Sequence, residues 1–233
     1  MRKIIPLFVL VAMVSACGFS SNLTRGQLYP GMYEEKPVTL LVMPPINNSA
    51  NVEAKELLYT SISRPLAEAG YYVIPPTLAM AVLRQESGYD AELFIDRPLK
   101  QFHEFFGADA VVFSVIESWA KQGLGINTEI RYIIKSAITD QILFDRTCDL
   151  YLDLSVDSNE NSDDKKKEQS LLAVLIDVAA GALNTALTDH IEAARKANYY
   201  IFRDLPVGKY DNLYLQDQDV SADPRNVTKH VKE

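Results

Sequence analysis

Apolar and polar residues alternate most regularly in the middle of the chain. Three long runs, at about 110–120, 127–138 and 141–155, show the period of two that is typical of β-strands, and short polar connections separate them. In the middle run the two faces differ in polarity: Ile130, Tyr132, Ile134 and Ile138 lie on one, and Glu129, Arg131 and Lys135 on the other. We therefore predict an antiparallel sheet with one wetter face.

Shorter strand-like and helix-like segments alternate before this sheet. Strands are predicted in "VTLLVMPPINNS" (38–49) and "YYVIP" (71–75), and helices at 52–70, 77–88 and 96–107. Pro65 is expected to kink or divide the first helix, because it has no backbone N–H to donate. Asp96 is the expected N-cap of the third helix, and Gly107 is expected just past its end.

A long helix is predicted after the sheet, over residues 170–200. Its most apolar run, 171–187, contains Asp177 and Asn184 and is shorter than a membrane span requires, so we expect a helix buried against the sheet. The fold class predicted is α/β: a single two-layer or three-layer sandwich with a mixed sheet, formed by residues 37–215.

Polar segments flank this domain on both sides. Residues 17–36 are interrupted by Pro30 and Gly31, and we predict that they form a tether, which as a flexible coil would average roughly 25 Å from end to end. Residues 216–233 are predicted to be a mobile polar tail.

The first residues have the pattern of a lipoprotein signal peptide, over residues 1–16. Arg2 and Lys3 precede an apolar stretch, 4–14, that is too short to span a bilayer. The following "VSAC" matches the bacterial lipobox, so Cys17 is expected to receive a diacylglycerol thioether and, once cleavage has freed its amine, a further acyl chain. The alternative is an ordinary secretory signal with an incidental cysteine. Gly18 is not the Asp that retains lipoproteins in the inner membrane, which favours the outer membrane.

Net charge limits the possible partners. The chain has 23 basic and 31 acidic residues, and loss of the leader removes two of the basic ones, which leaves a net charge of −10 (21 − 31). Nucleic acids and anionic lipid surfaces both attract basic proteins, so this balance excludes binding to nucleic acid and electrostatic adhesion to lipid.

Only Cys148 remains as a thiol once Cys17 is lipidated, which excludes an internal disulfide framework and a cysteine-based zinc site. Cys148 shares one predicted strand face with apolar residues: Ile142, Phe144, Leu150, Leu152 and Leu154. We expect it to be a small buried hydrophobic residue; the alternative is a reactive thiol.

No catalytic or cofactor motif is present, so neither catalytic residues nor a cofactor are expected. The three histidines, His103, His190 and His230, are not at metal-ligand spacing. One loop places oxygen ligands at positions 1, 3, 5, 7 and 12 of a calcium-binding template: Asp157, Asn159, Asn161, Asp163 and Glu168. Because Ser162 replaces the turn glycine and three lysines (165–167) lie within it, we expect a solvated loop without metal.

The lipobox followed by "VTLLVMPPINNS", "GADAVVFSVIESW" and "INTEIRYIIKSAITDQILFDRT" resembles a family of bacterial outer-membrane lipoproteins of unknown function, of the neisserial surface-antigen-candidate type. The resemblance extends to about residue 215 and implies a fold similar to the amino-terminal domain of TolB and to curli-secretion-channel lipoproteins. It also implies that a curli-secretion-channel-like lipoprotein is a partner in the envelope. Cys17 is the only family functional residue that it transfers to this chain.

Two functions remain possible. The first is a lipid-anchored, non-enzymatic interaction or accessory subunit of an envelope export or transport assembly. The second is a periplasmic hydrolase or ligand-binding enzyme with a carboxylate site involving Asp109, Glu117 or Asp145. The lack of a nucleophile motif favours the first.

We also expect the domain to form a homodimer. A sheet of long strands leaves edges whose backbone groups require a partner, and twofold pairing is the commonest solution. A monomer in which an edge charge such as Lys135 protects the sheet is the alternative.

Overall fold

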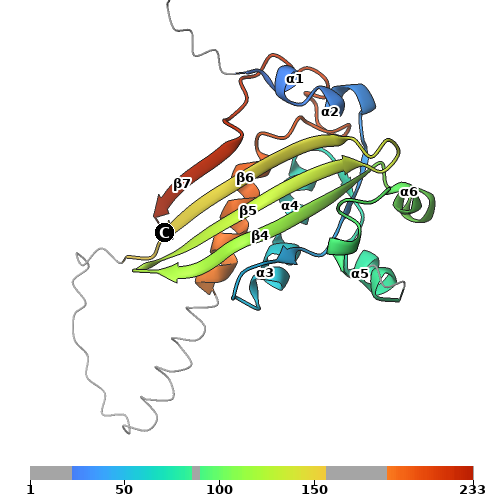
Figure 1. The fold of residues 1–233 in the computed structure, drawn as a ribbon. Coiled ribbons are helices and arrows are strands. Elements are labelled where there is room, and N and C mark those ends of the chain that lie inside the picture. The colour runs from blue at the N-terminus through green and yellow to red at the C-terminus, as the bar shows by residue number, and fades with distance from the viewer. Residues whose placement is uncertain (1–22, 86–89, 156–187, 233) are drawn as a thin grey trace, which may run out of the picture.

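The structure is a computed structural model that describes residues 23–85, 90–155 and 188–232. Its centre is a mixed seven-stranded sheet in the order β3-β1-β4-β5-β6-β7, with β2 paired to β4 (Figure 1). The strands are β1 (Thr39–Val42), β2 (Ile46–Asn47), β3 (Tyr72–Val73), β4 (Ala110–Gln122), β5 (Gly125–Ser136), β6 (Ile142–Asp153) and β7 (Asn226–Lys232). The three long strands are antiparallel, whereas β1 runs parallel to β3 and β4, and β7 parallel to β6.

Helices lie on both faces of this sheet. They are α1 (Arg25–Leu28), α2 (Pro30–Glu35), α3 (Ala54–Ser61), α4 (Ser63–Glu68), α5 (Pro76–Gln85), the short 3₁₀ helix η1 (Ala91–Leu93) and α6 (Lys100–Phe106). A further helix is described over residues 188–202. α3, α4 and the 188–202 helix pack on one face, and α5 and α6 on the other (Figure 1).

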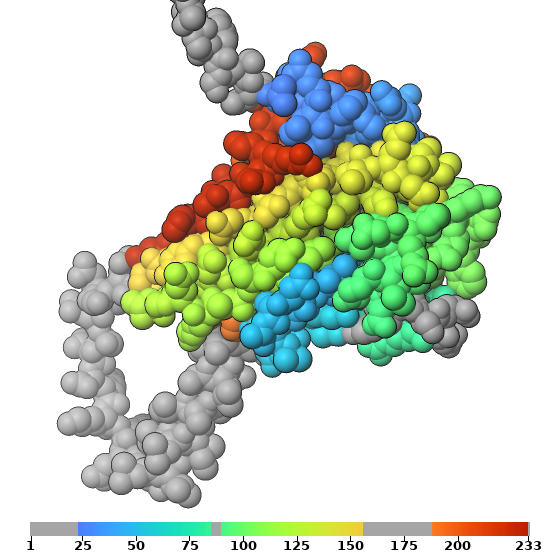
Figure 2. Space-filling model, viewed as in Figure 1, coloured from blue at the N-terminus to red at the C-terminus, as the bar shows by residue number. Residues whose placement is uncertain are grey.

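The two faces of the sheet have separate apolar cores. The first half of β4, "AVVFSVI", is buried at every position because its odd and even side chains enter different cores. Beyond α5 and α6 the second face is uncovered, and Figure 2 shows the side chains of β5 and β6 open to solvent there. The predicted mixed α/β sandwich is therefore confirmed, with three layers at the β1 side and two at the β6 side.

The three long strands are confirmed, with ends that shift by a few residues. Pro65 divides the first predicted helix as expected: α3 ends at Ser61, and α4 begins at Ser63 with the proline in its first turn. Gly107 follows α6 with a left-handed φ of 67°. The Asp96 N-cap was wrong, because α6 begins only at Lys100.

The wetter face was predicted correctly for Glu129 and Arg131, which are exposed. It was wrong for Lys135, whose Nζ donates to the carbonyl of Ile95 at 2.7 Å and whose side chain is buried under the second layer of helices. Ile138 lies past the end of β5 and is 58 % exposed, not part of the apolar face. Lys135 is also in an internal strand, so it protects no edge.

The tether prediction was wrong for residues 23–36. This segment forms α1 and α2, and its Tyr29 and Met32 are buried. Pro30 and Gly31 begin a helix here, because proline is compatible with the first helical turn. Gly31 packs closely on β6: a Cβ at this position would lie 2.9 Å from Leu143 Cδ2, so a larger residue would force the Leu143 side chain to shift.

The mobile tail was also wrong, because Asp217 and Ala222 are buried and a strand follows them. Residues 226–232 form β7, which adds a parallel strand beside β6 and buries Val227. Cys17, the calcium-like loop and residues 170–187 of the predicted long helix lie outside the described residues.

Candidate functional site

Arg146 is the largest fully buried side chain in the described residues, with a side chain 0 % exposed. Its guanidinium donates to the carboxylate of Asp204, to the Tyr29 hydroxyl at 2.6 Å and to the carbonyl of Pro224. Arg146 lies on β6, whereas its partners come from the residue that precedes α2 and from two parts of the C-terminal segment. A buried charge is tolerated only when paired and hydrogen-bonded in this way.

A second ion pair joins the same segments. Arg25 Nη1 is 2.9 Å from Asp217 Oδ2, and Asp217 also accepts from the Tyr33 hydroxyl at 3.1 Å and from the backbone N–H of Val207 at 3.0 Å. Arg25 Nε lies 3.6 Å from Asp204, which connects the two pairs. We call these six residues the clasp: Arg25, Tyr29, Tyr33, Arg146, Asp204 and Asp217.

Backbone bonds reinforce the clasp where the N-terminal segment meets the C-terminal one. The N–H of Arg25 donates to the carbonyl of Val220 at 2.8 Å, and that of Gly26 to Gln218 at 2.9 Å. The N–H of Ala222 donates back to the carbonyl of Leu23 at 2.8 Å. Leu23, the first described residue, is therefore part of the folded domain and not of a flexible tether.

Burial raises the pKa of the Tyr29 hydroxyl far above its ordinary value, and the pKa of Tyr33 rises for the same reason. Both phenols therefore stay protonated and keep donating to Asp204 and Asp217 at any physiological pH.

The sequence did not predict the clasp, although one signal was present. Arg146 has the same parity as Phe144 and Cys148 along β6, so a charge stood on the face predicted to be buried. Because such a charge needs a carboxylate partner, the pattern indicates a buried ion pair. The partner itself, Asp204, lies 58 positions away and could not be identified from spacing.

The three candidate carboxylates each accept from a different group. Asp109 Oδ2 accepts from the N–H groups of Val38 and Thr39, both at 2.9 Å, and so fixes the start of β1. Glu117 accepts from the Asn48 amide at 3.0 Å at the surface. These contacts are structural.

Asp145 forms a surface ion pair on the open sheet face. Arg131 Nε donates to it at 2.8 Å, and Arg225 Nη2 at 2.7 Å. The hydrogen bond from Arg131 is the main reason that the pKa of Asp145 lies below its usual value. A carboxylate held ionised between two arginines is a poor general acid.

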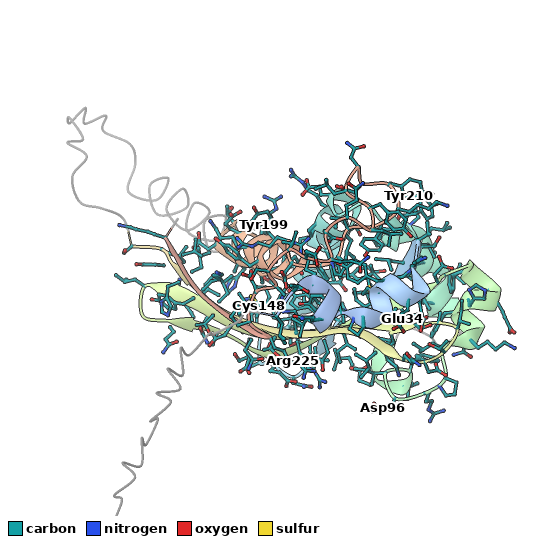
Figure 3. All side chains as sticks on the ribbon, turned by 90° about the horizontal axis from the view of Figure 1, so that it is seen from above. Glu34, Asp96, Cys148, Tyr199, Tyr210 and Arg225 are labelled. Carbon is teal, nitrogen blue, oxygen red and sulfur yellow. The ribbon has the colours of Figure 1, made fainter. Side chains whose placement is uncertain are left out.

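The histidines and Cys148 occupy structural positions. His103 Nδ1 lies 2.8 Å from the carbonyl of Ala108, and His190 Nδ1 accepts from Trp119 Nε1 at 2.8 Å. The His230 ring packs at 5.4 Å from Tyr151. No group of three potential metal ligands occurs within 23–85, 90–155 and 188–232. Cys148 is buried as predicted, and burial raises the pKa of its thiol to about 12 (Figure 3).

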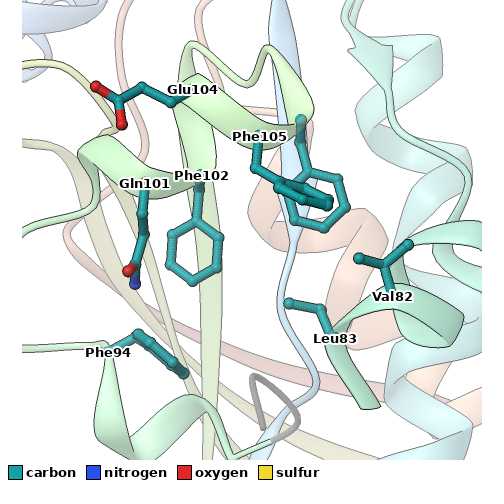
Figure 4. Close-up of a pocket in the computed structure, with 8 residues that line it drawn as sticks. Val82, Leu83, Phe94, Gln101, Phe102, Glu104 and Phe105 are labelled. Carbon is teal, nitrogen blue, oxygen red and sulfur yellow. The ribbon is translucent and has the colours of Figure 1, made fainter. Parts of the chain in front are cut away.

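An apolar pocket of about 520 Å³ lies between α5 and α6 (Figure 4). Half of its lining residues are phenylalanines, and one of these, Phe105, is 66 % exposed; the four are Phe94, Phe102, Phe105 and Phe106. The candidate carboxylates Asp109, Glu117 and Asp145 do not line it. Gln101 and Glu104 are its polar lining residues, and one carboxylate beside one amide supplies no acid–base pair for catalysis.

Residues 28–207 match the protein family described as "Putative lipoprotein GNA1162-like". The chain belongs to this family. The match confirms the resemblance found in the strand and turn motifs. It includes Tyr29, Arg146 and Asp204 of the clasp, whereas Arg25 and Asp217 lie beyond its limits.

Among similar proteins is the "Putative lipoprotein NMB1124/NMB1162" of Neisseria meningitidis serogroup B, 35% identical over 92 residues. The match covers 39% of this chain and 42% of that relative, so the chain spans less than half the length of the relative.

Three solved structures are similar to parts of this GNA1162-like chain. The crystal structure of lipoprotein GNA1162 from Neisseria meningitidis shares 23% identity and covers 64% of this chain and 99% of its own, with a TM-score of 0.44. The C-terminal domain of LpoB from Salmonella enterica shares 13% identity, and the match covers 53% of this chain and 93% of that domain, with a TM-score of 0.36. A chain of the PelC dodecamer from Paraburkholderia phytofirmans shares 12% identity, and the match covers 48% of this chain and 73% of the PelC chain, with a TM-score of 0.32.

In the part of the GNA1162-like chain that the structure describes, no helix combines the length and the apolar character needed to cross a bilayer.

Proposed function

We propose that this lipoprotein is anchored to the outer membrane through acyl chains on Cys17 and faces the periplasm. There it acts as a non-enzymatic interaction or accessory subunit of an envelope export or transport assembly, with a curli-secretion-channel-like lipoprotein as a partner. The clasp carries the proposal, because it fixes the chain close to the expected anchor. Membership of a lipoprotein family supports it.

The position of the first fixed residue supports a domain held near its membrane. Leu23 follows Cys17 by six residues, and its carbonyl is hydrogen-bonded to Ala222. Six residues span at most roughly 20 Å when fully extended. A domain that begins this close to its lipid has little freedom to move away, which suits a subunit that works at the membrane surface.

The side chains that could have formed an enzyme site support the non-enzymatic part of the proposal. Asp109 fixes a strand, Asp145 lies between two arginines, and the buried Cys148 is protonated at neutral pH. These groups therefore contribute to the fold instead of to a reaction.

Crosslinking in the native envelope, followed by mass spectrometry, tests the proposed role. The wild-type chain should crosslink to subunits of one export or transport assembly, and a Cys17→Ala chain of the same expression level should lose these crosslinks. Crosslinks that are unchanged by Cys17→Ala would contradict the role of the anchor. Hydrolysis of an envelope substrate that is abolished by Asp145→Asn would contradict the non-enzymatic assignment.

Self-association is part of the proposal, through the free edge of β7. In the described residues β7 pairs with no strand other than β6, so along residues 226–231 its other edge has no strand partner there. Light scattering on a chain that begins at Leu23 should give a dimer mass.

Proline scanning of β7 provides the control for this dimer. Backbone N–H groups of consecutive residues point to opposite edges of a strand, so one of Thr228→Pro and Lys229→Pro removes a donor from the free edge alone. That variant should become monomeric without loss of Tm. A wild-type monomer at tens of micromolar would contradict the dimer.

A further inference from the structure

A long groove runs between α3 and α4 on one side and the 188–202 helix on the other. Its main part has a volume of about 670 Å³ and is lined by charged and tyrosine side chains, among them Arg64, Glu68, Arg195, Lys196 and Tyr199. A second hollow of about 210 Å³ shares Glu68 and Tyr199 with it and extends to Arg203. The two hollows therefore form one elongated depression, which we call the Arg195 groove.

The walls of the Arg195 groove are fixed to each other beneath it. The buried Asn198, on the 188–202 helix, donates to Ser61 Oγ of α3 at 2.9 Å. Its Oδ1 accepts from the Tyr132 hydroxyl of β5 at 2.8 Å. A buried, fully bonded amide of this kind holds helix and sheet in one arrangement, so the groove is preformed.

The charge of this groove is opposite in sign to that of the whole chain. Five cations line it against two carboxylates: Arg25, Arg64, Arg195, Lys196 and Arg203 against Glu68 and Glu192. The chain as a whole carries a net charge of −8. A locally positive groove on an acidic protein attracts negatively charged partners to that place and repels them elsewhere.

Both carboxylates are already neutralised within their own helices. Glu68 pairs with Arg64 at 2.7 Å, and Glu192 with Lys196 at 3.3 Å. Arg195 is exposed and has no ion-pair or hydrogen-bond partner among the described residues. Arg203 reaches Asp223 only at 3.5 Å, in a pair that is open to solvent. Arg195 is thus a donor in the main part of the groove that no described side chain occupies.

Tyr199 adds an apolar surface beside these cations. Its side chain is 54 % exposed, lies on the side of the helix that faces away from the sheet (Figure 3) and packs at 5.5 Å from the ring of Tyr200. A tyrosine ring contacts aliphatic side chains and peptide planes at little entropic cost. The elongated shape and this mixture of cations and rings fit a polypeptide better than a small anion.

We propose that the Arg195 groove binds an acidic, extended polypeptide segment of a partner protein. Carboxylates of that segment bind Arg195 and Arg203, and its apolar side chains pack on Tyr199. This inference deepens the proposed function by naming the contact surface, but its test requires neither the anchor nor the assembly, so the two can fail separately.

Fluorescence anisotropy with a short labelled peptide of alternating glutamate and leucine tests the groove. The full chain, in a neutral detergent, should bind this peptide and not the matched peptide in which glutamine replaces glutamate. Arg195→Glu should weaken binding about fivefold or more, and Tyr199→Ala about threefold. Lys121→Glu, an equal charge reversal on an exposed residue of β4 outside the groove, should change binding less than about twofold.

Equal binding of the two peptides, or an equal effect of Arg195→Glu and Lys121→Glu, would overturn the proposal. So would binding of phosphatidylglycerol vesicles, but not of the acidic peptide, that depends on Arg195, because the occupant would then be a lipid surface. Loss of self-association in Arg195→Glu without any peptide binding would assign the groove to a second copy of the chain and would also overturn it.

Discussion

The buried guanidinium of Arg146 requires hydrogen-bond partners from distant parts of the chain. Its guanidinium is surrounded by groups from three separate parts of the chain, and none of them is replaceable by water, because the side chain is fully enclosed. Such a pair contributes little net stability compared with an apolar substitute, but loss of one partner leaves an uncompensated charge. The clasp therefore makes the position of the N-terminal segment specific.

Asp204→Ala should lower the free energy of unfolding by about 3 kcal/mol or more, because it leaves Arg146 charged and buried. Urea denaturation measures the change. Glu104→Ala is the matched control: it removes an exposed partner of Lys100 and should change stability by less than about 0.5 kcal/mol. Similar stabilities for the two variants would show that the clasp does not hold the fold.

His190 should make stability depend on pH. Its Nδ1 accepts from Trp119, and burial lowers its pKa below the ordinary value, with Glu53 and Asp189 opposing this effect and Lys121 adding to it. A depressed pKa in the folded state means that the unfolded chain takes up the proton first. The contribution of His190 is therefore present above the unfolded pKa of about 6.5 and is lost as the pH falls through the folded pKa.

Thermal denaturation between about pH 7.5 and pH 5 tests this contribution. The wild-type Tm should fall more over this range than that of His190→Gln, which keeps an acceptor but cannot be protonated there. Parallel curves for the two proteins would refute the link between His190 and acid sensitivity.

At the scale of elements, α1 and α2 are structural parts of the domain. They bury Tyr29 and Met32, supply Arg25 and Tyr33 to the clasp, and place Gly31 against Leu143 of β6. A chain that begins at Pro37 should therefore be less stable than one that begins at Leu23 by roughly several kcal/mol, because it exposes this surface, takes Arg25 and Tyr33 from Asp217 and takes the Tyr29 hydroxyl from Arg146.

Urea denaturation of the two truncated chains measures that difference. If residues 23–36 were a tether, as their composition suggested, the two chains would unfold at the same urea concentration.

The limits of sequence reasoning are visible in the same elements. The long strands were predictable because the period of two extends over a dozen residues and Gly107 and Pro65 mark helix ends by local sterics. α1, α2 and β7 were not, because they are short and polar, and their stability comes from distant partners: Leu143 and Arg146 for the first two, and the edge of β6 for the third. The clasp was missed for the same reason.

At the scale of the whole molecule, the N-terminal segment is fixed to residues 217–222, the stretch of chain that precedes β7. The N-terminal segment, β6 and the C-terminal segment join at the clasp, while the Arg195 groove opens on the helical layer. In the proposed function, a domain fixed close to a lipid anchor and carrying a preformed charged groove would hold a partner near the membrane. The proposal requires Cys17 as the point of attachment.

Mass spectrometry of the mature amino terminus, on protein purified from the membrane fraction, tests this central claim most directly. The account predicts that the chain begins at Cys17, that this residue carries a diacylglycerol thioether and an acylated amine, and that Cys17→Ala accumulates with its leader uncleaved. A mature chain recovered with an unmodified amino terminus would contradict it.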